Sequence, residues 1–458
     1  MGNFDVVIVG AGTGGSYASY LLAKAGFNVA LIEMKRRDHV FKTTGDAIGI
    51  HHIERMVIKP PSYVFTIRYE GAEIYSPDLS VKYVVLGKGF GLDMAKWAQW
   101  LISEAESAGA HIFDGYKVQG PIIENGKVSG VKVLRPDGTV EEFRAKVVID
   151  ASGAAAVIRS RLPRGWWVSE PLLPEDVSNA YREIVEVDYE VERPEYIRIY
   201  LNADIAPGGY WWLFPKGRNV INIGLGVWGK LTEERGLNPR HNYDKYLANS
   251  QYVRGRRVIH AGGGIVPTRR PLPSLVANGF LAVGDAAVTV NPVHGGGIGP
   301  ALLSAELASK AVVDAFEKGD YSERGLWRYN IDYLRAYGIK QAMLDVFRLM
   351  LQTLSNEQLN RGLRARILTE DEVLEISEKG SLQLSLMDKL KIALRLARVP
   401  DVASKLRLAF KYMNEVKSLY EAYPTSPEGL SSWYGMLVSV YREYTSKLGI
   451  SLRWLSSV

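Results

Sequence analysis

The N-terminus of the chain combines a glycine-rich turn with flanking strand and helix patterns, and this combination restricts the fold more than any other feature. Residues 6–9 form a short apolar, β-branched run, which is typical of a strand buried on both faces. Gly10, Gly12 and Gly15 follow in the spacing G-x-G-x-x-G, directly before a helix-like segment. The first glycine permits a tight turn, the second lets a pyrophosphate approach the backbone, and the third lets helix and strand pack closely. The pattern predicts a Rossmann-type dinucleotide-binding fold.

An acidic residue ends the second predicted strand, residues 29–32, and narrows the choice of dinucleotide. Glu33 can accept hydrogen bonds from a ribose 2′-hydroxyl and would repel a 2′-phosphate, which argues against NADP at this site. A glycine-rich turn alone also occurs in unrelated α/β folds. The strand, the helix and the acid at the expected distance together favour dinucleotide binding. Glu33 does not distinguish NAD from FAD.

A second glycine-rich segment, residues 280–308, favours FAD. Asp285 follows an apolar strand and is placed to bond the ribityl hydroxyls of a flavin. Gly295, Gly296 and Gly297 precede a predicted helix, whose N-terminus would face the flavin N1–C2=O edge. Negative charge gathers at this edge on reduction, and a helix N-terminus stabilises negative charge. Because FAD is long, a contact this far along the chain suits an FAD-binding fold, so we expect FAD as the cofactor.

Length and composition limit the remaining possibilities. A chain of 458 residues with 47% hydrophobic residues predicts two or three domains with a sizeable core. The net charge of +6 is too small to imply a nucleic-acid partner, and no apolar stretch is long and charge-free enough to span a bilayer. The N-terminus enters a strand without a signal-peptide pattern, so we expect a cytoplasmic protein. The absence of cysteine excludes disulfides and thiol relays, and the seven histidines show no metal-ligand spacing, so no metal is expected.

Strand and helix patterns predict an α/β fold with an added antiparallel β-sheet. Residues 92–115 have the pattern of a helix followed by a strand, and residues 127–153 alternate as a β-meander does. Two further antiparallel stretches are expected to form one sheet over the flavin. The predicted regions are a discontinuous Rossmann-type FAD-binding domain (1–51, 91–164 and 272–320), an antiparallel-sheet substrate domain (52–90 and 165–271) and a C-terminal helical region (321–458).

A basic segment in the helical region, residues 386–417, contains eight Lys or Arg residues and three acidic ones. One interpretation is an amphipathic helix that rests on an anionic membrane surface, which would place the protein at the inner face of the membrane. The other is an ordinary surface helix whose apolar face packs into the core, and we favour it because such helices are common.

An aromatic segment supplies a more specific pattern. Residues 209–215 read GYWWLFP and are followed, after eight further residues, by Gly224-Leu225-Gly226. This pattern resembles the Y-x-W-x-F-P…G-x-G signature of geranylgeranyl reductases, in the flavoprotein superfamily of para-hydroxybenzoate hydroxylase. Other segments resemble the archaeal members, the digeranylgeranylglycerophospholipid reductases, and the resemblance covers essentially the whole chain. These segments are AYRE (180–183), VPTRRPL (266–272) and NPVHGGG (291–297).

The resemblance implies a FAD-dependent reduction of isolated C=C bonds in geranylgeranyl chains, carried on the diphosphate or on archaeal ether phospholipids. It also implies that Tyr210, Trp212, Phe214 and Pro215 line an isoprenoid tunnel beside the flavin. The chain has no second G-x-G-x-x-G fingerprint for NAD(P)H, so NADPH, NADH and ferredoxin all remain possible external reductants.

Two positions depart from the family pattern. In the loop KTTGDAIG, residues 42–49, Thr44 occupies the position of a family cysteine, while Gly45 and Asp46 match. The helix that starts near residue 92 lacks the arginine common in the superfamily, so cofactor binding is expected to depend more on Gln99.

The aromatic segment suits the implied chemistry. An unactivated alkene accepts hydride poorly, and positive charge builds at its tertiary carbon, so the site should be apolar, dry and rich in π-faces. Strand alternation places Tyr210, Trp212 and Phe214 on one face and Trp211 on the other. Plain core packing is the usual explanation for such a strand, and the family resemblance favours the tunnel instead. A proton could come from His294, Asp46, Tyr210 or an ordered water.

Three sets of candidate residues follow. The catalytic candidates are Tyr210, Trp212, Phe214, His294, Asp46 and Thr44. The cofactor-binding candidates are Gly10, Gly12, Gly14, Gly15, Glu33, Met34, Gly45, Asp46, Gln99, Val118, Ala151, Gly153, Gly284, Asp285, Pro292, Gly295, Gly296, Gly297 and Ile298. The substrate-binding candidates are Tyr210, Trp211, Trp212, Phe214, Pro215, Gly224, Gly226, His51 and His52, the two histidines as ligands of an anionic headgroup or as structural residues.

A flavin monooxygenase or halogenase on the same fold, and a non-catalytic prenyl-lipid binder, are the alternative functions.

Overall fold

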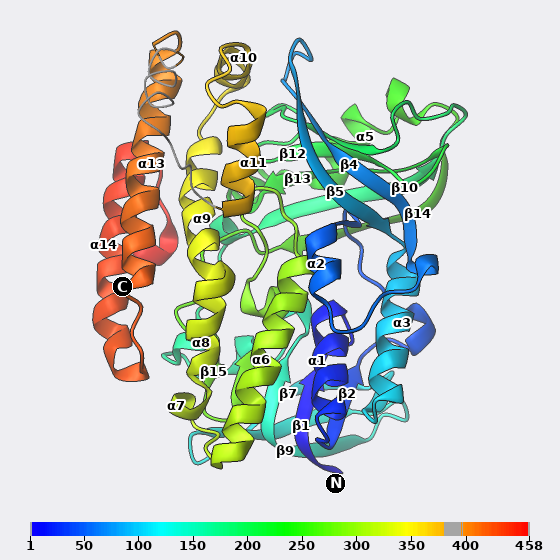
Figure 1. Cartoon of the computed structure of the whole chain (residues 1–458), viewed down its shortest axis with the longest axis vertical. Helices are drawn as coiled ribbons and strands as arrows, with labels where there is room; N and C mark the ends of the chain where they lie inside the picture. The colour runs from blue at the N-terminus through cyan, green and yellow to red at the C-terminus, as the bar shows by residue number, and fades with distance from the viewer. Residues whose placement is uncertain (1, 380–394, 396, 457–458) are drawn as a thin grey trace.

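The computed structural model describes residues 2–379, 395 and 397–456. Two sheets lie at opposite ends of an elongated molecule, and the C-terminal helices run along one side of both (Figure 1). The N-terminus lies at the end of the molecule that holds the first sheet, and a long central helix, α6 (Ile298–Lys318), extends from that end toward the second sheet. The predicted architecture, a Rossmann-type fold with an antiparallel sheet and a helical region, is confirmed.

In the first sheet the N-terminal strand lies between two parallel neighbours. β1 (Gly2–Val9) pairs in parallel with β2 (Val29–Glu33) and β9 (Val140–Asp150), and β2 pairs in parallel with β6 (His111–Asp114). Val6, Val7 and Ile8 of β1 are fully buried, as expected for a parallel strand that is covered by helices on both faces. The remaining elements of this part are β7 (Lys117–Glu124), β8 (Lys127–Leu134), β15 (Val276–Ala277), β16 (Phe280–Ala282), α1 (Thr13–Lys24) and α3 (Met94–Ser107).

The second sheet has eight strands in the order β14-β10-β13-β12-β11-β4-β5-β3. Its strands come from both predicted stretches, and most neighbours are antiparallel. The pair β11·β4 is parallel, with Tyr196 opposite Gly71, which corrects the expectation of a purely antiparallel sheet. The strands are β3 (Ala47–Gly49), β4 (Phe65–Tyr75), β5 (Lys82–Leu92), β10 (Ser178–Glu186), β11 (Tyr196–Tyr200), β12 (Tyr210–Pro215), β13 (Val220–Trp228) and β14 (Arg257–Val266).

The short strand β3 belongs to the second sheet because it pairs with β5, Ala47 lying opposite Gly91. The predicted division placed these residues in the first domain, which ran to residue 51. The chain therefore passes from one sheet to the other a few residues earlier than expected, and the division into domains stays a prediction. Short helices at the rims of the second sheet are α2 (Ile50–Arg55), α4 (Gly229–Arg235) and α5 (Pro239–Tyr246).

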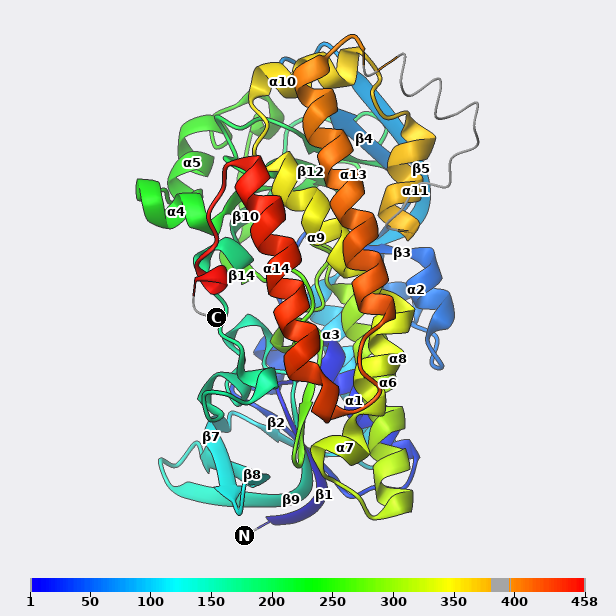
Figure 2. The same ribbon diagram turned by 90° about the vertical axis from the view of Figure 1, so that its left-hand side faces the viewer.

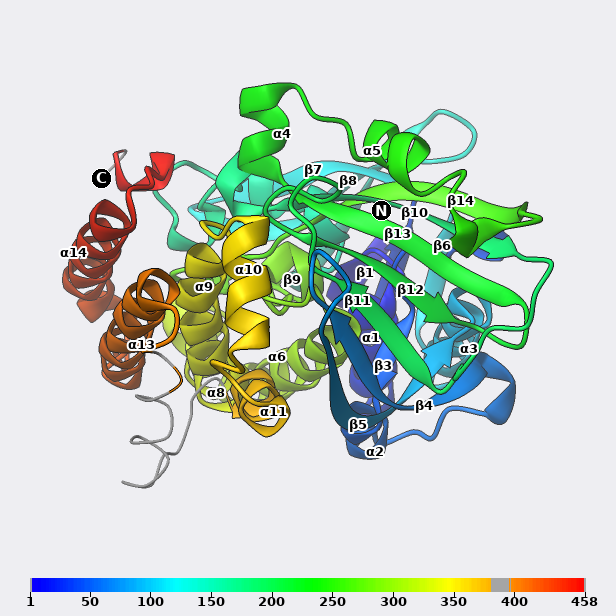
Figure 3. The same ribbon diagram turned by 90° about the horizontal axis from the view of Figure 1, so that it is seen from above.

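The C-terminal region is helical, and α13 and α14 form an outer layer over α9 (Figures 2 and 3). Residues 386–394 and 396 of the basic segment lie outside the described residues. The described part of this segment in α13 packs Val402, Leu406 and Ala409 into the core, as an ordinary surface helix does. Over the described residues, no helix is long and apolar enough to cross a bilayer. The helices are α7 (Glu323–Leu326), α8 (Arg328–Tyr333), α9 (Ile339–Leu351), α10 (Asn356–Arg364), α11 (Glu370–Lys379), α13 (Pro400–Glu421) and α14 (Leu430–Leu448).

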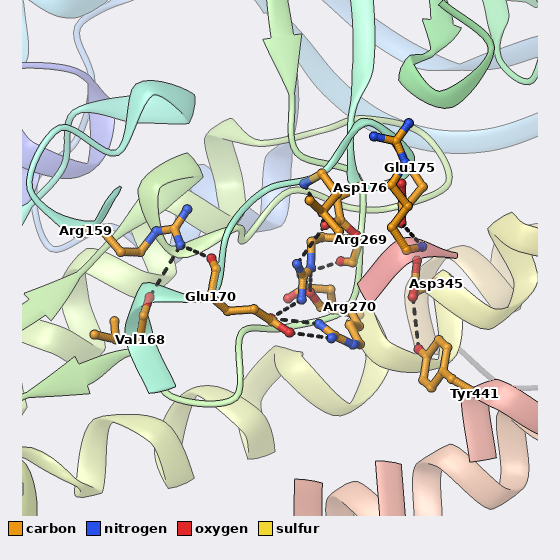
Figure 4. Close-up of polar contacts among 12 residues, drawn as sticks. Arg159, Val168, Glu170, Glu175, Asp176, Arg269, Arg270, Asp345 and Tyr441 are labelled. Atoms are coloured by element: carbon orange, nitrogen blue, oxygen red, sulfur yellow. Dashed lines mark hydrogen bonds and ion pairs between the residues drawn. The ribbon is translucent and has the colours of Figure 1, made fainter. Parts of the chain in front are cut away.

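A buried ion cluster joins the loop before β10, the loop after β14 and the C-terminal helices (Figure 4). The Glu170 carboxylate accepts hydrogen bonds from Arg270 Nη2 at 2.7 Å, from the Tyr434 hydroxyl at 2.8 Å and from the Arg269 guanidinium. Arg269 also pairs with Asp176 at 3.0 Å. Arg269 and Arg270 are each 1% exposed, so these two guanidinium groups are structural parts of the interior.

The same region contains a second buried pair that belongs to α9. Asp345 Oδ1 lies 2.7 Å from Arg348 Nη2, and Asp345 Oδ2 accepts a hydrogen bond from the Tyr441 hydroxyl of α14 at 3.0 Å (Figure 4). Arg348 Nη1 also donates to the Glu175 carbonyl at 3.2 Å. Because buried charges must be paired, these contacts hold α9 and α14 in one position against the loops that border the second sheet.

We predict that Glu170→Ala lowers the free energy of unfolding by about 3–5 kcal/mol, because it leaves two buried guanidinium groups without their shared carboxylate. The measurement is urea denaturation followed by circular dichroism. Glu190→Ala is the matched control, since Glu190 pairs with Arg218 at the surface, where their side chains are 76% and 87% exposed. It should change the free energy by less than about 0.5 kcal/mol. Equal losses in the two variants would contradict the prediction.

Candidate functional site

One cavity of about 1070 Å³ connects the three parts of the molecule. Its walls include the carboxyl ends of β1 and β2, the N-terminus of α6, one face of the second sheet, and side chains of α9, α10, α11 and α13. Figure 3 looks down on the second sheet with these helices beside it. Ligand pockets commonly measure about 300–1,000 Å³, so this cavity has room for a long ligand or for two ligands.

The glycines after β1 let the backbone pack where no side chain would fit. Gly10 has φ +100°, and a Cβ there would lie 2.6 Å from the Ala151 carbonyl oxygen. A Cβ on Gly15 would lie 1.9 Å from the Gly10 carbonyl oxygen, so α1 approaches the turn closely only because Gly15 has no side chain. Gly12 lines the cavity with open space where its side chain would be. The N-terminus of α1 therefore meets the cavity as bare backbone.

Glu33 is held at the edge of this end of the cavity by two backbone groups. Its Oε2 accepts a hydrogen bond from Ala11 N and its Oε1 from Lys35 N, each at 2.9 Å. The carboxylate is mostly buried and lines the cavity beside Met34. This position fits the predicted contact with a ribose.

The second helix N-terminus at the cavity belongs to α6. Gly297 precedes its first residue, and no side chain of the described part of the chain caps this end. The preceding loop is held by Asn291, whose Oδ1 accepts hydrogen bonds from Val293 N at 2.9 Å and His294 N at 3.2 Å. Asp285 faces the same end of the cavity and forms an ion pair with Lys42. Two helix N-termini that meet one cavity provide two places where partial positive charge stabilises an anionic group.

Two histidines near this loop are neutral at neutral pH. Burial, together with the charge of Lys340, lowers the pKa of His294 to about 4, and its Nδ1 accepts a hydrogen bond from Gly296 N at 3.1 Å. Burial and the adjacent His51 lower the pKa of His52 to about 3. The His52 ring occupies the space beside Gly299 in α6, where a Cβ would lie 2.3 Å away. His52 therefore supports the α6 N-terminus, and neither His51 nor His52 is part of the cavity wall.

The aromatic strand β12 forms the wall opposite these loops. In the pairing of β12 with β13, Tyr210 lies opposite Gly226 and Trp212 opposite Gly224. The rings of Tyr210, Trp212 and Phe214 line the cavity, as the alternation predicts. Burial raises the pKa of Tyr210 to about 12, and its hydroxyl donates a hydrogen bond to the His294 carbonyl at 2.6 Å.

A polar network beside the aromatic wall was not found from the sequence, and its members Thr44, Asp46 and Arg182 also line the cavity. Asp46 Oδ2 accepts hydrogen bonds from Lys216 Nζ at 3.0 Å and from Asn222 Nδ2 at 2.9 Å. The Thr44 carbonyl accepts from Asn222 Nδ2 at 2.9 Å and from Arg182 Nε at 3.2 Å. The sequence contained partial signals, since Lys216 directly follows FP of the aromatic segment and Arg182 is the arginine of AYRE.

Beyond the aromatic wall the cavity continues as an apolar arm between the second sheet and the C-terminal helices. The arm was also missed from the sequence, because the apolar face of a helix has the same pattern whether it lines a cavity or fills a core. Its lining includes Ile74, Val85 and Ile199 of the sheet and Phe347, Leu351, Leu363, Leu374, Val402 and Leu406 of the helices.

Several predicted site residues do not reach the cavity. Trp211 points to the opposite core and stacks on Tyr200 at 3.6 Å between ring centroids. The Gln99 amide donates to the Arg37 carbonyl, and Met94 of the same helix lines the cavity instead. Pro215 offers its carbonyl to the Tyr69 hydroxyl behind the wall. The predicted residues that do not line the cavity are Gly15, His51, His52, Gln99, Trp211, Pro215 and Gly224. The roles of all the predicted site residues stay predictions.

Comparison with known proteins places two segments of the chain in described families. Residues 176–266 match the geranylgeranyl reductase catalytic domain, and residues 8–45 match an NAD(P)-binding Rossmann-like domain. The first match covers most of the second sheet, including the aromatic strand, and the second covers the glycine turn and Glu33.

The matches to similar proteins cover most or nearly all of the chain. The digeranylgeranylglycerophospholipid reductase of Sulfolobus acidocaldarius is 39% identical over 97% of this chain and 99% of its own length. The digeranylgeranylglycerophospholipid reductase 2 of Methanopyrus kandleri is 31% identical over 82% of this chain and 95% of its own. Among solved structures, a geranylgeranyl bacteriochlorophyll reductase-like protein of Thermoplasma acidophilum has a TM-score of 0.76 and 26% identity, and the match covers 89% of this chain and 100% of that one. A myxobacterial FAD-dependent halogenase has a TM-score of 0.62 at 17% identity over 87% and 97% of the two chains, which shows the fold alone.

The geometry of the wall generates a prediction for two neighbouring glycines. In Gly224→Ala the new Cβ would lie 2.4 Å from Arg182 Cβ and 2.6 Å from a Trp212 ring carbon, so the free energy of unfolding should fall by about 1–3 kcal/mol. Gly226→Ala is the control, because its Cβ would meet nothing within 4 Å. Chemical denaturation of both variants is the measurement, and equal stabilities would show that the Trp212 ring does not lie over Gly224.

Proposed function

Because the chain belongs to the geranylgeranyl reductase family, we propose that it is a FAD-dependent reductase that saturates isolated C=C bonds of geranylgeranyl chains. The observation that carries the proposal is the continuity of one cavity, which leads from the dinucleotide glycines past Tyr210, Trp212 and Phe214 into the apolar arm. A cofactor and an isoprenoid chain can meet in this cavity at the aromatic wall.

The residues present fit FAD. The bare N-terminus of α1 suits a pyrophosphate, Glu33 suits a ribose hydroxyl, and the N-terminus of α6 suits the edge of a flavin that gains negative charge on reduction. When bound and reduced, FAD supplies the hydride. The remaining chemistry depends on residues of the chain.

The chain supplies an apolar, water-poor binding site for the alkene. The apolar arm takes the isoprenoid tail, and its burial of apolar surface contributes most of the binding free energy. The rings of β12 offer π-faces to the double bond, and such faces stabilise positive charge that develops at a tertiary carbon. Tyr210 keeps its proton at neutral pH and lies at the junction of the two ends of the cavity.

The proposal includes a substrate class and an external reductant. The relatives' names include a glycerophospholipid, so we expect an ether phospholipid or the free diphosphate as substrate. NAD(P)H or ferredoxin is the expected external reductant, and a peripheral contact with the membrane would deliver a lipid substrate to the cavity.

The direct test is anaerobic incubation of the FAD-loaded, dithionite-reduced protein with geranylgeranyl diphosphate and, in parallel, with a geranylgeranylated ether lipid. We expect a gain of two hydrogens for each reduced bond, detected by mass spectrometry, and reoxidation of the flavin that depends on the alkene. A protein that binds no FAD, or that binds lipid without reoxidation of the reduced flavin, would contradict the proposal. Hydroxylation coupled to oxygen consumption would indicate a monooxygenase instead.

A glycine in the apolar arm generates a prediction about chain length. Gly362 of α10 lines the arm, and a Cβ there would lie 3.4 Å from Ile367 Cδ1 and 3.8 Å from Val402 Cγ1. In Gly362→Leu the longer side chain fills the arm, so kcat/KM for the 20-carbon substrate should fall about tenfold relative to that for a 10-carbon prenyl diphosphate.

The matched control for this variant is Gly435→Leu in α14, an exposed helical glycine whose Cβ would meet nothing within 4 Å. It should leave the ratio of the two substrates unchanged. An unchanged ratio in Gly362→Leu would show that the isoprenoid does not occupy the arm.

A further inference from the structure

The aromatic wall has one member whose polar atom is bound by a relay of side chains. Trp212 Nε1 donates a hydrogen bond to Asn222 Oδ1 at 3.0 Å. Asn222 Nδ2 in turn donates to Asp46 Oδ2 at 2.9 Å, and Lys216 Nζ donates to the same oxygen at 3.0 Å. The indole N–H is thus turned into the protein, toward a fully buried amide, while the ring lines the cavity.

The relay has features that packing alone does not require. Asp46 adopts φ +67°, a left-handed conformation that is unfavourable for a residue with a side chain, and its carboxylate is 3% exposed. Its Oδ1 has no hydrogen-bond partner among the described residues. A buried ion pair with Lys216 costs desolvation free energy that an apolar pair of the same shape would avoid. Groups held at such a cost beside a cavity indicate a functional requirement.

The relay also restricts the orientation of the ring. Gly224 lies opposite Trp212 on β13, and the ring fills the space that a Cβ would take, 2.6 Å from a ring carbon. Phe214 is confined in the same way by Gly45, where a Cβ would lie 3.0 Å from its ring. With its Nε1–Cζ2 edge held against Asn222 and Gly224, the indole cannot turn this edge to the cavity.

A hydrogen bond from an indole N–H to an acceptor raises the electron density of the ring, and the effect grows when that acceptor is itself polarised by a carboxylate. An electron-rich ring face stabilises a nearby positive charge more strongly, and among aromatic side chains the indole does so best. Tyr210 directs its hydroxyl to a backbone carbonyl and Phe214 has no polar atom, so the relay acts on Trp212 among the three rings of the wall.

We propose that Asn222, held by Asp46 and Lys216, is a positioning residue that fixes the Trp212 ring against the reacting double bond and makes its face more electron-rich. The inference rests on the proposed function, because it needs positive charge to develop on a substrate in the cavity. It assigns a role to Asn222 and Lys216, which do not themselves form the cavity wall.

The catalytic test is a double-mutant cycle with Asn222→Leu and Trp212→Phe. Leucine has a similar volume to asparagine and can neither donate nor accept, and phenylalanine keeps a ring without the N–H. In single-turnover reoxidation of the reduced flavin, Asn222→Leu should lower the limiting rate constant about tenfold, with the half-saturating substrate concentration nearly unchanged. It should have little further effect in the Trp212→Phe background. Equal effects in both backgrounds would overturn the proposal.

The second readout does not depend on activity. Protein labelled with ¹⁵N-tryptophan has ten indole N–H groups, and Trp212→Phe identifies the signal of Trp212. Asn222→Leu should move that signal upfield and speed its hydrogen exchange while the other signals stay in place. Asp46→Asn, which preserves shape, should shift it in the same direction by a smaller amount and serves if Asn222→Leu does not fold. An unmoved Trp212 signal would overturn the relay.

A matched control separates the proposed role from general loss of stability. Asn330 is 2% exposed and accepts a hydrogen bond from Leu275 N at 2.7 Å, away from the cavity. Asn330→Leu should lower stability without moving the Trp212 signal or changing kcat selectively. If the reduced wild-type protein leaves every double bond intact, the proposed function fails and the catalytic role of Asn222 fails with it, while the indole spectrum still decides whether the relay exists.

Discussion

The position of the cavity depends on the pairing of buried charges around Glu170. This carboxylate binds Arg269 and Arg270 from the loop after β14 and Tyr434 from α14, and three segments distant in sequence are thereby fixed together. Because an unpaired charge in this interior costs several kcal/mol, the arrangement tolerates little displacement. The helix α9 carries both the second pair, Asp345 with Arg348, and side chains that line the apolar arm. The charged pairs therefore hold α9, which carries part of the lining of the apolar arm, in place against α14 and the neighbouring loops.

The glycines of the aromatic segment have a physical meaning once the sheet register is known. Gly224 lies opposite Trp212 on the adjacent strand, and the absence of its side chain leaves room for the indole ring. Gly226, opposite Tyr210, leaves open space in the cavity wall. The spacing between the aromatic residues and the G-x-G pattern thus encodes a cross-strand pairing, in which one strand supplies rings and the next supplies room for them.

Local patterns predicted the parts of the structure that depend on local sequence. The turn at Gly10, the carboxylate of Glu33 at the end of β2 and the alternation along β12 all follow from spacing within one strand or one strand–helix–strand unit. Contacts between distant segments could not be read in this way. The parallel pair β11·β4, the ion pair of Asp46 with Lys216 and the apolar arm each join residues more than a hundred positions apart. Helical periodicity indicates which face of α3 carries Gln99, but it does not indicate which group that face contacts. The sequence therefore did not reveal the hydrogen bond from Gln99 to the Arg37 carbonyl.

The electrostatics of the site suit a reaction in which positive charge develops on carbon. A basic group beside such a carbon would remove a proton and regenerate an alkene. His294 is the imidazole in the cavity loop, and its Nδ1 lone pair is already engaged by Gly296 N, so the remaining nitrogen carries the proton of the neutral ring. Desolvation by the surrounding loop and the charge of Lys340 lower the pKa of this ring to about 4, which makes it a weak base at neutral pH. The Tyr210 hydroxyl, which donates to the His294 carbonyl, also retains its proton. The His294 ring therefore presents an N–H and no free lone pair beside the aromatic wall, and the Tyr210 proton is engaged by the His294 carbonyl, so neither group is a strong base toward a carbon atom in the cavity.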